Sequence, residues 1–420
     1  MRIAIVGSGV SGLVCAHMLD PHHQVTLFEA GERPGGHTNT VEVEVGGALH
    51  RVDTGFIVYN ERTYPAFSSL LTHLGVATNA SEMSFSVTDE RTGLEWRGTS
   101  PSTLFAQRRN VANPAFLRML VDVARFNRAA RRVAAEPARY ADLTLGEFLG
   151  RGNWSRQLTD WYLVPLGSAI WSADPASFSA IPVATFARFF DNHGLLRLGD
   201  QPRWRTVEGG AARYVDGILG RLRGRVRHGT GVEKIVRRPA DGTVELLTSD
   251  GRLEGFDHVV VATHSDQALR LLADPTPSER DVLGAIRYQP NQATLHTDAR
   301  LMPRATRAWA SWNYHRMATD RRMATVTYNL NRLQGIDSCL PILLTLNREE
   351  DIDPASVLAT YEYDHPVLDA GAVAAQRRRD EVSGRAGTSF AGAYWGYGFH
   401  EDGVQSAVDV CRALGVETPW

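Results

Sequence analysis

The sequence predicts an α/β protein with a Rossmann-like dinucleotide-binding domain and an adjoining α+β substrate domain. Three observations predict this fold: an apolar run that ends at closely spaced glycines, an alanine- and leucine-rich helix directly after them, and a second apolar run that ends on an acid. Together they occupy residues 2–29 with the spacing of a βαβ nucleotide-binding unit.

The first glycine turn reads Gly7-Ser8-Gly9-Val10-Ser11-Gly12. Gly7 allows a tight turn after the first strand, Gly9 lets the backbone approach a pyrophosphate, and Gly12 lets the following helix pack closely on the sheet. The helix that starts near Ser11 directs free N–H groups toward the phosphates. Such a motif alone is often only a glycine-rich turn, but the flanking strands and the acid favour a nucleotide site.

An acid and a second glycine turn complete this site. Glu29, followed by Ala30, ends the second strand, and its carboxylate can accept both hydroxyls of an adenosine ribose. The ligand is therefore FAD or NAD. The chain then reads Gly35-Gly36-His37-Thr38, a turn close enough to return to the same pyrophosphate. An NAD-only enzyme does not need this second turn.

The two turns together resemble those of the flavoproteins that include flavin-containing amine oxidases, protoporphyrinogen oxidase and phytoene desaturase. This resemblance implies a GR2-type flavoprotein fold with FAD as the cofactor. The arginines that often follow the ribose acid and the glycine pair in this family are replaced here by Gly31 and His37. No cysteine precedes the closing Phe-Ala-Gly segment, where some amine oxidases attach the flavin, so we expect noncovalent FAD.

Later segments resemble further cofactor contacts of the same flavoproteins. The resemblance places Thr54, Gly55 and Phe56 along the isoalloxazine edge, although a plain strand-end turn is the alternative. It brings Val232 to the adenine through its backbone, and the Ala262-Thr263 turn to the flavin. Near the end of the chain, a strand, a turn and a helix would hold the pyrimidine side of the flavin. The residues expected to contact the cofactor there are Gly392, Asp402, Gly403, Val404 and Ala407.

The order of these motifs predicts two interleaved domains. We expect a discontinuous FAD-binding domain of residues 1–78, 200–287 and 376–420, and a substrate domain with a helical cap formed by residues 79–199 and 288–375. Periodicity predicts a hairpin over 40–52, a helix over 65–74, strands within 82–98 and 288–347, and a buried parallel strand over 257–263. His365 and Pro366 are interpreted as a surface connection.

Residues 101–150 carry apolar side chains at helical spacing with arginines between them. They predict either a solvated cap helix or an arginine-faced amphipathic surface that rests on a membrane as a peripheral contact and draws in a lipid. The net charge of −2 gives no reason to expect a nucleic-acid partner. The first strand starts at Arg2, which leaves no room for a signal peptide. We therefore expect a cytoplasmic protein, with attachment to the inner membrane as the alternative.

Aromatic residues mark the expected substrate side. We interpret Trp171, His193, Trp395 and Tyr397 as candidate substrate contacts, with plain packing as the alternative for each. A pocket rich in aromatic and leucine side chains suits a small apolar substrate. The three cysteines, Cys15, Cys339 and Cys411, lack the spacing of a metal site, so no metal is expected. The catalytic residue is not identified.

These features predict an FAD-dependent oxidoreductase, a dehydrogenase or desaturase that removes hydride from an apolar, lipid-like acyl or isoprenoid chain. One alternative is a flavin amine oxidase with Trp395 and Tyr397 as its aromatic cage. The family lysine near the flavin is absent, because Lys234 is the only lysine. A redox-neutral double-bond isomerase and a non-enzymatic FAD-binding protein are further alternatives, and the oligomeric state stays open.

Overall fold

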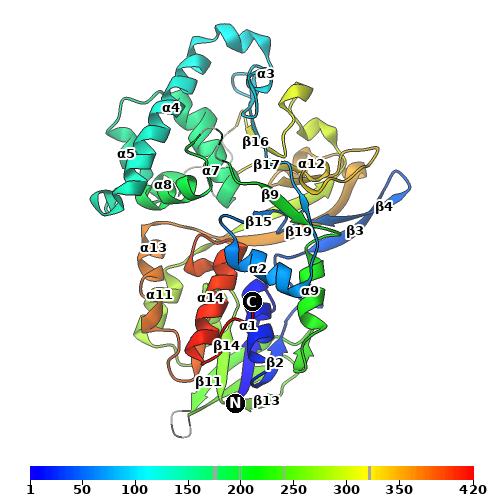
Figure 1. Cartoon of the computed structure of the whole chain (residues 1–420), viewed down its shortest axis with the longest axis vertical. Helices are drawn as coiled ribbons and strands as arrows, with labels where there is room; N and C mark the ends of the chain where they lie inside the picture. The colour runs from blue at the N-terminus through cyan, green and yellow to red at the C-terminus, as the bar shows by residue number, and fades with distance from the viewer. Residues whose placement is uncertain are drawn as a thin grey trace.

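Five parallel strands form a sheet at the end of the molecule that holds the N-terminus (Figure 1). The computed structural model describes residues 1–172, 174, 177–197, 199, 201–238, 240, 242–319 and 323–420. The strands lie in the order β10 (Arg225–Arg227), β2 (Gln24–Phe28), β1 (Arg2–Val6), β14 (His258–Val261) and β20 (Thr388–Phe390). Because β1 pairs with both β2 and β14, the strand before the first glycine turn is central. The parallel strand predicted within 257–263 is confirmed.

Alternate side chains of β1 point to opposite faces of this sheet. Ile3 and Ile5 pack against one layer, and Ala4 and Val6 pack against another. The first layer contains α1 (Val10–Leu19), α2 (Pro65–Leu74), α9 (Ala212–Leu219) and α14 (His400–Ala413). The second contains the antiparallel strands β11 (Val232–Arg238), β12 (Thr243–Thr248) and β13 (Leu253–Phe256) with α10 (Ser265–Leu271), α11 (Pro277–Gly284) and α13 (Ala370–Gln376). Burial on both faces explains the apolar sequences of the central strands β1 and β14.

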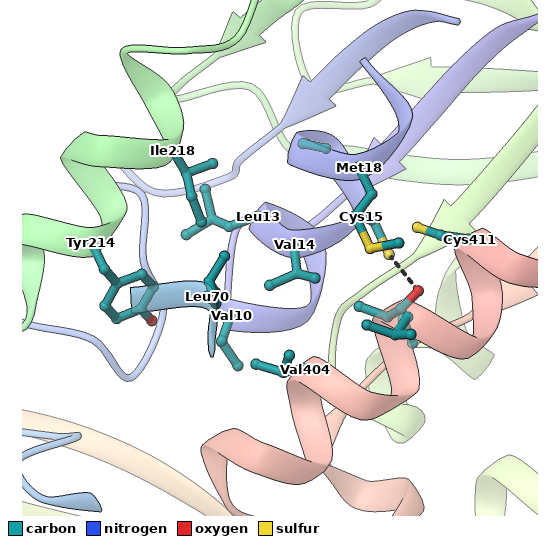
Figure 2. Close-up of a cluster of buried hydrophobic side chains, with 14 of the residues drawn as sticks. Val10, Leu13, Val14, Cys15, Met18, Leu70, Tyr214, Ile218, Val404 and Cys411 are labelled. Carbon is teal, nitrogen blue, oxygen red and sulfur yellow. Dashed lines mark hydrogen bonds between the residues drawn. The ribbon is translucent and has the colours of Figure 1, made fainter. Parts of the chain in front are cut away.

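The first and last helices pack against each other across one face of the sheet (Figure 2). The Ser11 hydroxyl donates to the Gly403 carbonyl at 3.0 Å, although these residues lie 392 positions apart. A Cβ on Gly403 would lie 2.7 Å from the Val10 side chain, so only glycine allows this approach. One helix turn further, the Cys15 thiol lies 3.9 Å from the Ala407 carbonyl. The two ends of the chain therefore form one structural unit.

A seven-stranded mixed sheet lies between the parallel sheet and the helical end of the molecule (Figure 1). Its strands lie in the order β19 (Val357–Pro366), β15 (Tyr288–His296), β18 (Leu343–Leu346), β17 (Val326–Asn329), β16 (Trp312–Arg316), β7 (Phe85–Asp89) and β8 (Leu94–Arg97). All neighbours are antiparallel except β16 and β7. The strands expected within 82–98 and 288–347 are thus confirmed, and they share one sheet.

Short strands connect the two sheets. The predicted hairpin is confirmed as β3 (Thr40–Val45) and β4 (Ala48–Asp53). A small antiparallel sheet contains β5 (Tyr59–Asn60), β9 (Trp204–Val207) and β6 (Thr78–Ala80). The helix predicted over 65–74 matches α2, which begins at Pro65 and ends before a left-handed Gly75.

Residues 101–192 form the helical end of the molecule (Figure 1). It comprises α3 (Pro101–Leu104), η1 (Arg108–Ala112), α4 (Pro114–Ala135), η2 (Pro137–Tyr140), α5 (Leu145–Gly150), α6 (Arg156–Leu158), the π-helical η3 (Thr159–Leu163), α7 (Val164–Trp171), η4 (Ser177–Ala180) and α8 (Val183–Asn192). Thr144 and Glu147 cap α5 reciprocally. Phe126 on α4 packs against Phe186 on α8, with ring centroids 6.0 Å apart. None of the described helices has both the length and the apolar character needed to cross a bilayer.

Helix α13 shifts one predicted domain boundary. The expected boundary between residues 375 and 376 falls inside this helix. Ala372 and Ala375 are buried in the layer beneath the parallel sheet. Because α13 packs there, it belongs with the cofactor-binding part, and the chain leaves the seven-stranded sheet at the end of β19.

Candidate cofactor and substrate site

The two glycine turns meet at the carboxyl end of the parallel sheet. The Gly35 N–H donates to the Ser8 carbonyl at 3.0 Å, and Gly35 has a left-handed φ of +116°. A Cβ on Gly36 would lie 3.1 Å from the Gly9 Cα. By contrast, nothing lies within 4 Å of the position that a Cβ on Gly9 would take. The turns therefore enclose open space on the Gly9 side, where a pyrophosphate is expected.

The start of α1 adds hydrogen-bond donors to this space. Gly9 is the N-terminal cap of α1, and no side chain caps the helix. The first-turn N–H groups of Val10, Ser11 and Gly12 are thus left for a ligand, and the helix dipole favours an anion there. This arrangement fits the phosphates of a dinucleotide.

Glu29 lies beside the same turn. Its carboxylate accepts hydrogen bonds from the Ser8 N–H at 3.0 Å, from the Ser8 hydroxyl, and from the Gly31 N–H at 2.8 Å. The side chain is half-buried, so part of the carboxylate stays accessible to a ribose. The Glu29 carbonyl accepts from the Thr230 N–H at 2.9 Å, which brings the start of β11 and Val232 close to Ala30.

Two predicted cofactor neighbours, Phe56 and Thr38, meet the start of α14. His400, the first residue of α14, stacks on Phe56 with ring centroids 3.6 Å apart and planes at 15°. Its Nε2 lies 3.0 Å from the Thr38 hydroxyl and 3.2 Å from the Tyr214 hydroxyl. Burial lowers the pKa of His400 to about 3, so the ring is neutral. The sequence pattern did not indicate His400 as a contact.

Gly7, Gly55 and the end of β14 lie close together at the carboxyl end of the parallel sheet. A Cβ on Gly7 would lie 2.9 Å from the Ala262 carbonyl oxygen and 3.3 Å from Thr263. A Cβ on Gly55 would lie 2.1 Å from the His37 carbonyl oxygen. The Thr54 hydroxyl lies 2.7 Å from the Tyr363 hydroxyl, which ties this edge to β19.

Three histidines gather beside the second glycine turn. The ring centroid of His37 lies 5.5 Å from that of His365 and 6.0 Å from that of His264. Burial, reinforced by the neighbouring histidines, holds the pKa of His37 well below its usual value. Burial and the nearby His264 lower the pKa of His365 to about 4. The cluster is therefore neutral.

The interpretation of His365 as a surface connection is wrong. His365 lies near the end of β19, opposite Gln289 of β15, and its Nδ1 lies 3.0 Å from the Asn291 amide nitrogen. This pairing turns its ring toward His37. No sequence signal indicated the contact, because it joins segments more than three hundred residues apart.

Asp53 connects the cofactor strands to the substrate sheet. Its carboxylate accepts from the Ala211 N–H at 2.9 Å, the Thr40 hydroxyl at 2.5 Å and the Gln334 amide at 2.9 Å. Burial raises the pKa of Asp53 to about 7 even though these donors oppose the rise. Gln334 belongs to α12 (Leu330–Gln334), so this carboxylate joins both parts of the molecule.

A cavity of about 570 Å³ lies between α8 and the start of α14. Its aromatic wall contains Phe189, Tyr397 and Phe399, and the ring centroids of Phe189 and Tyr397 lie 5.3 Å apart. His193 also lines the cavity, and its ring stacks on that of Phe189 with centroids 3.9 Å apart. Burial lowers the pKa of His193 to about 4. The structure thus brings together two of the predicted substrate residues, His193 and Tyr397.

The carboxylates of this cavity are already engaged by the protein. Asp191 pairs with Arg197 at 3.5 Å. Glu401 accepts hydrogen bonds from the Ala66 and Phe67 N–H groups at the start of α2, at 3.1 and 2.9 Å. Burial raises the pKa of Asp402 to about 6, and the Phe399 N–H donates to it at 2.9 Å.

The other two predicted substrate residues lie away from the cavity. Trp171 is 6% exposed and lies in the core of the helical end of the molecule. Its ring centroid lies 4.7 Å from that of Phe189. The Trp395 indole N–H donates to the Phe390 carbonyl at 3.1 Å, and the Arg379 guanidinium lies 5.6 Å from the Trp395 ring centroid. Trp395 therefore packs beside the layer that contains β11, β12, β13, α10, α11 and α13. It does not form an aromatic cage with Tyr397.

Two predicted cofactor residues of the closing segment, Gly392 and Ala407, lie in closely packed surroundings. The Gly392 N–H donates to the Ser406 hydroxyl at 2.9 Å. Ala407 is fully buried, and its carbonyl faces Cys15 of α1. Gly403 and Val404 lie in the first turn of α14 and are also buried. The start of α14, rather than its second turn, is thus the part that lies beside the predicted flavin neighbours.

The fold and the two glycine turns define a dinucleotide-binding oxidoreductase, and the family follows from sequence comparison. The family model described as flavin containing amine oxidoreductase matches residues 10–307. The chain belongs to this family, and it is an FAD-dependent enzyme. Over 47 residues it is also 49% identical to an L-amino-acid oxidase from Pseudechis australis, a match that spans 11% of this chain and 9% of that relative's length.

Solved structures show the same fold across the whole chain. Cyclohexylamine oxidase from Brevibacterium oxydans IH-35A superposes with a TM-score of 0.70 at 18% identity, with 99% of both chains covered. The CLA-producing fatty acid isomerase from P. acnes superposes with a TM-score of 0.69 at 16% identity, again with 99% of both chains covered.

The residues at the sheet edge fit FAD. The open space at Gly9, the uncapped start of α1 and the accessible Glu29 carboxylate fit the pyrophosphate and the ribose. Phe56, Thr38 and the start of α14 would hold the flavin end. Bound FAD supplies a two-electron acceptor for hydride from carbon. The protein's own residues place the substrate and keep water away.

Proposed function

We propose that this enzyme is an FAD-dependent dehydrogenase or desaturase that removes hydride from an apolar acyl or isoprenoid chain. The observation that carries the proposal is the aromatic wall of Phe189, Tyr397 and Phe399 beside the start of α14. An apolar chain buried against these rings gains roughly 25 cal/mol for each Å² of apolar surface removed from water. The wall therefore suits a hydrocarbon segment better than a charged one.

The contacts of the carboxylates that line this cavity also support an apolar substrate. An ammonium group bound in this cavity needs a carboxylate that is free to pair with it. Glu401 and Asp402 accept backbone N–H groups at the starts of helices. Asp191 forms an ion pair with Arg197 at 3.5 Å, while its Oδ1 has no hydrogen-bond partner among the described residues. An amine would have to displace the partners of Glu401 and Asp402 or compete with Arg197 for Asp191, which makes the amine-oxidase alternative the weaker one.

Dehydrogenation also releases a proton, which needs an acceptor. With FAD bound as the hydride acceptor, a base would take the proton and a carbon–carbon double bond would form between the two carbons. The neutral histidines His37, His264 and His365, which gather beside the second glycine turn, are the candidate bases. The fatty acid isomerase with the same fold makes a redox-neutral isomerase the second candidate, because it shows that the fold can act on a fatty acid.

Anaerobic reduction of the bound flavin distinguishes these candidates. The holoprotein is mixed without oxygen with fatty acyl lipids, an isoprenoid precursor or simple amines, and the flavin absorbance is followed. We expect bleaching by a lipid and none by the amines. Reduction by an amine but by no lipid would overturn the proposal. A lipid product with a shifted double bond and no bleaching would identify the isomerase.

A substitution in the aromatic wall tests where the chain binds. Tyr397→Asp places a carboxylate in the apolar wall, so we expect at least tenfold weaker binding of the reducing lipid. Tyr397→Phe keeps the ring and is the matched control, with near-unchanged binding. Both variants should retain the flavin spectrum. Equal lipid affinity in the two variants would place the substrate elsewhere.

A further inference from the structure

The outer face of η1 and α4 combines arginines with exposed apolar side chains. Residues 101–135 contain seven arginines and a single acid, Asp122. The chain as a whole carries a net charge of −2, so positive charge is strongly concentrated here. Val111, Leu117 and Val121 are 55%, 40% and 57% exposed. They are three of the eight exposed large apolar side chains among the described residues.

The helical period of α4 separates this outer face from the core. Phe116, Met119, Phe126, Ala130 and Val133 are buried against the neighbouring helices. The positions between them are exposed; these are Leu117, Arg118, Val121, Ala124, Arg125, Arg128, Arg131 and Arg132. The outer face of α4 therefore carries no exposed acid along its length.

The single acid fixes two of the arginines instead of opposing the charge of the face. The buried Asp122 pairs with Arg118 at 3.0 Å and with Arg125 at 2.6 Å. Although burial alone would raise it, hydrogen bonds from Ser155 and from these arginines hold the pKa of Asp122 to about 2. Within the described part of the chain, Arg128, Arg131 and Arg132 take part in no ion pair.

We propose that the outer face of η1 and α4 binds the surface of an anionic phospholipid bilayer. Guanidinium groups pair with lipid phosphates, while Val111, Leu117 and Val121 insert at the boundary between head groups and acyl chains. A single-stranded nucleic acid would instead need exposed aromatic rings on which bases stack. The two aromatic residues of α4, Phe116 and Phe126, are fully buried.

The position of this face suits a lipid-handling enzyme, although the inference does not depend on the substrate. Helix α4 packs on α8 through Phe126 and Phe186. The C-terminal end of α8 contributes Phe189 and His193 to the cavity. Figure 1 shows α4 at the end of the molecule remote from the N-terminus, where a planar surface can reach it. A bilayer bound here would lie one helix away from the cavity.

Sedimentation with vesicles tests the inference on the full-length holoprotein. We expect binding to vesicles of phosphatidylcholine mixed with phosphatidylglycerol, weak binding to phosphatidylcholine alone, and weaker binding at high salt. The triple variant Arg128→Gln/Arg131→Gln/Arg132→Gln should bind the anionic vesicles at least tenfold more weakly. The double variant Leu117→Gln/Val121→Gln should also bind more weakly, but with an unchanged salt dependence.

A matched control uses the opposite end of the molecule. Arg252→Gln/Leu253→Gln removes an exposed arginine and an apolar side chain that is 59% exposed on β13, and it should bind like the wild type. Flavin absorbance and the thermal unfolding midpoint report that each variant is folded. Equal binding of the triple variant and the control would overturn the inference. So would equal binding to both vesicle types, or tighter binding to single-stranded RNA than to anionic vesicles.

Discussion

Replacing Gly9 by valine should give a folded protein that no longer holds FAD. Gly9 has an ordinary φ of −62°, and nothing lies within 4 Å of the position that its Cβ would take, so the protein itself accommodates the side chain. The same space is where the pyrophosphate would approach the backbone. We expect FAD affinity to fall at least about a hundredfold, which corresponds to roughly 3 kcal/mol. The stability of the apoprotein should change by no more than about 1 kcal/mol, the usual effect at a helix cap.

Two further glycines serve as controls for this variant. Gly255→Val, on β13, also introduces a side chain into open space and should retain the flavin. Gly12→Val would place a Cβ 1.9 Å from the Gly7 carbonyl oxygen, so it should fail to fold. The measurements are flavin absorbance relative to protein, FAD titration and thermal unfolding without FAD. A Gly9→Val protein that keeps its full yellow colour would contradict the assignment of the turn.

The protein should lose stability steeply below about pH 6. Burial keeps seven histidines neutral in the folded protein, with pKa values of about 3 or 4; these are His17, His193, His258, His296, His315, His365 and His400. Their pKa in the unfolded chain is about 6.5. As the pH falls through 6.5, the unfolded chain therefore binds protons that the folded protein does not, and the free energy of unfolding decreases.

Two buried acids act in the opposite direction. The pKa values of Asp53 and Asp402 are raised to about 7 and about 6, so these groups bind protons in the folded protein first. Seven histidines less two acids leave the unfolded chain with about five more bound protons than the folded one near pH 5. The free energy of unfolding should then fall by roughly 7 kcal/mol for each pH unit. Because domains are typically stable by about 5–15 kcal/mol, unfolding is expected within roughly three units below pH 6.

Urea unfolding of the apoprotein at several pH values measures this slope. His258 lies away from the cofactor residues, with its Nε2 3.0 Å from the Ser389 hydroxyl. His258→Asn removes one of the seven histidines, so it should reduce the slope by about 1.4 kcal/mol for each pH unit. A free energy of unfolding that stays constant between pH 7 and pH 5 would show that these histidines are not held neutral by the fold.

The sequence predicted those parts of the site that depend on local backbone geometry. Gly7, Gly9 and Gly12 follow a short apolar strand, and a tight turn with close helix packing needs glycines at that spacing, so the turn was predictable. The start of α2 was predictable for the same reason, because Pro65 is suited to the first turn of a helix. Local sequence determines these features almost alone.

Contacts between distant segments were not predictable. His365 reaches His37 only because β19 pairs with β15 in one particular register. Trp395 was expected beside Tyr397, but the short η10 helix (Ala393–Trp395) turns its ring toward Arg379. A slip of one residue in the β19–β15 register would turn the His365 side chain to the opposite face of the sheet. The aromatic wall likewise depends on how α8 packs against the start of α14.

The central claim is that the two ends of the chain hold one FAD without a covalent bond. The most direct measurement is the visible spectrum of the purified protein, followed by acid precipitation and mass analysis of the supernatant. We expect a yellow protein that releases stoichiometric, intact FAD into the supernatant. A protein that is colourless when purified, and stays so after incubation with FAD, would contradict the claim.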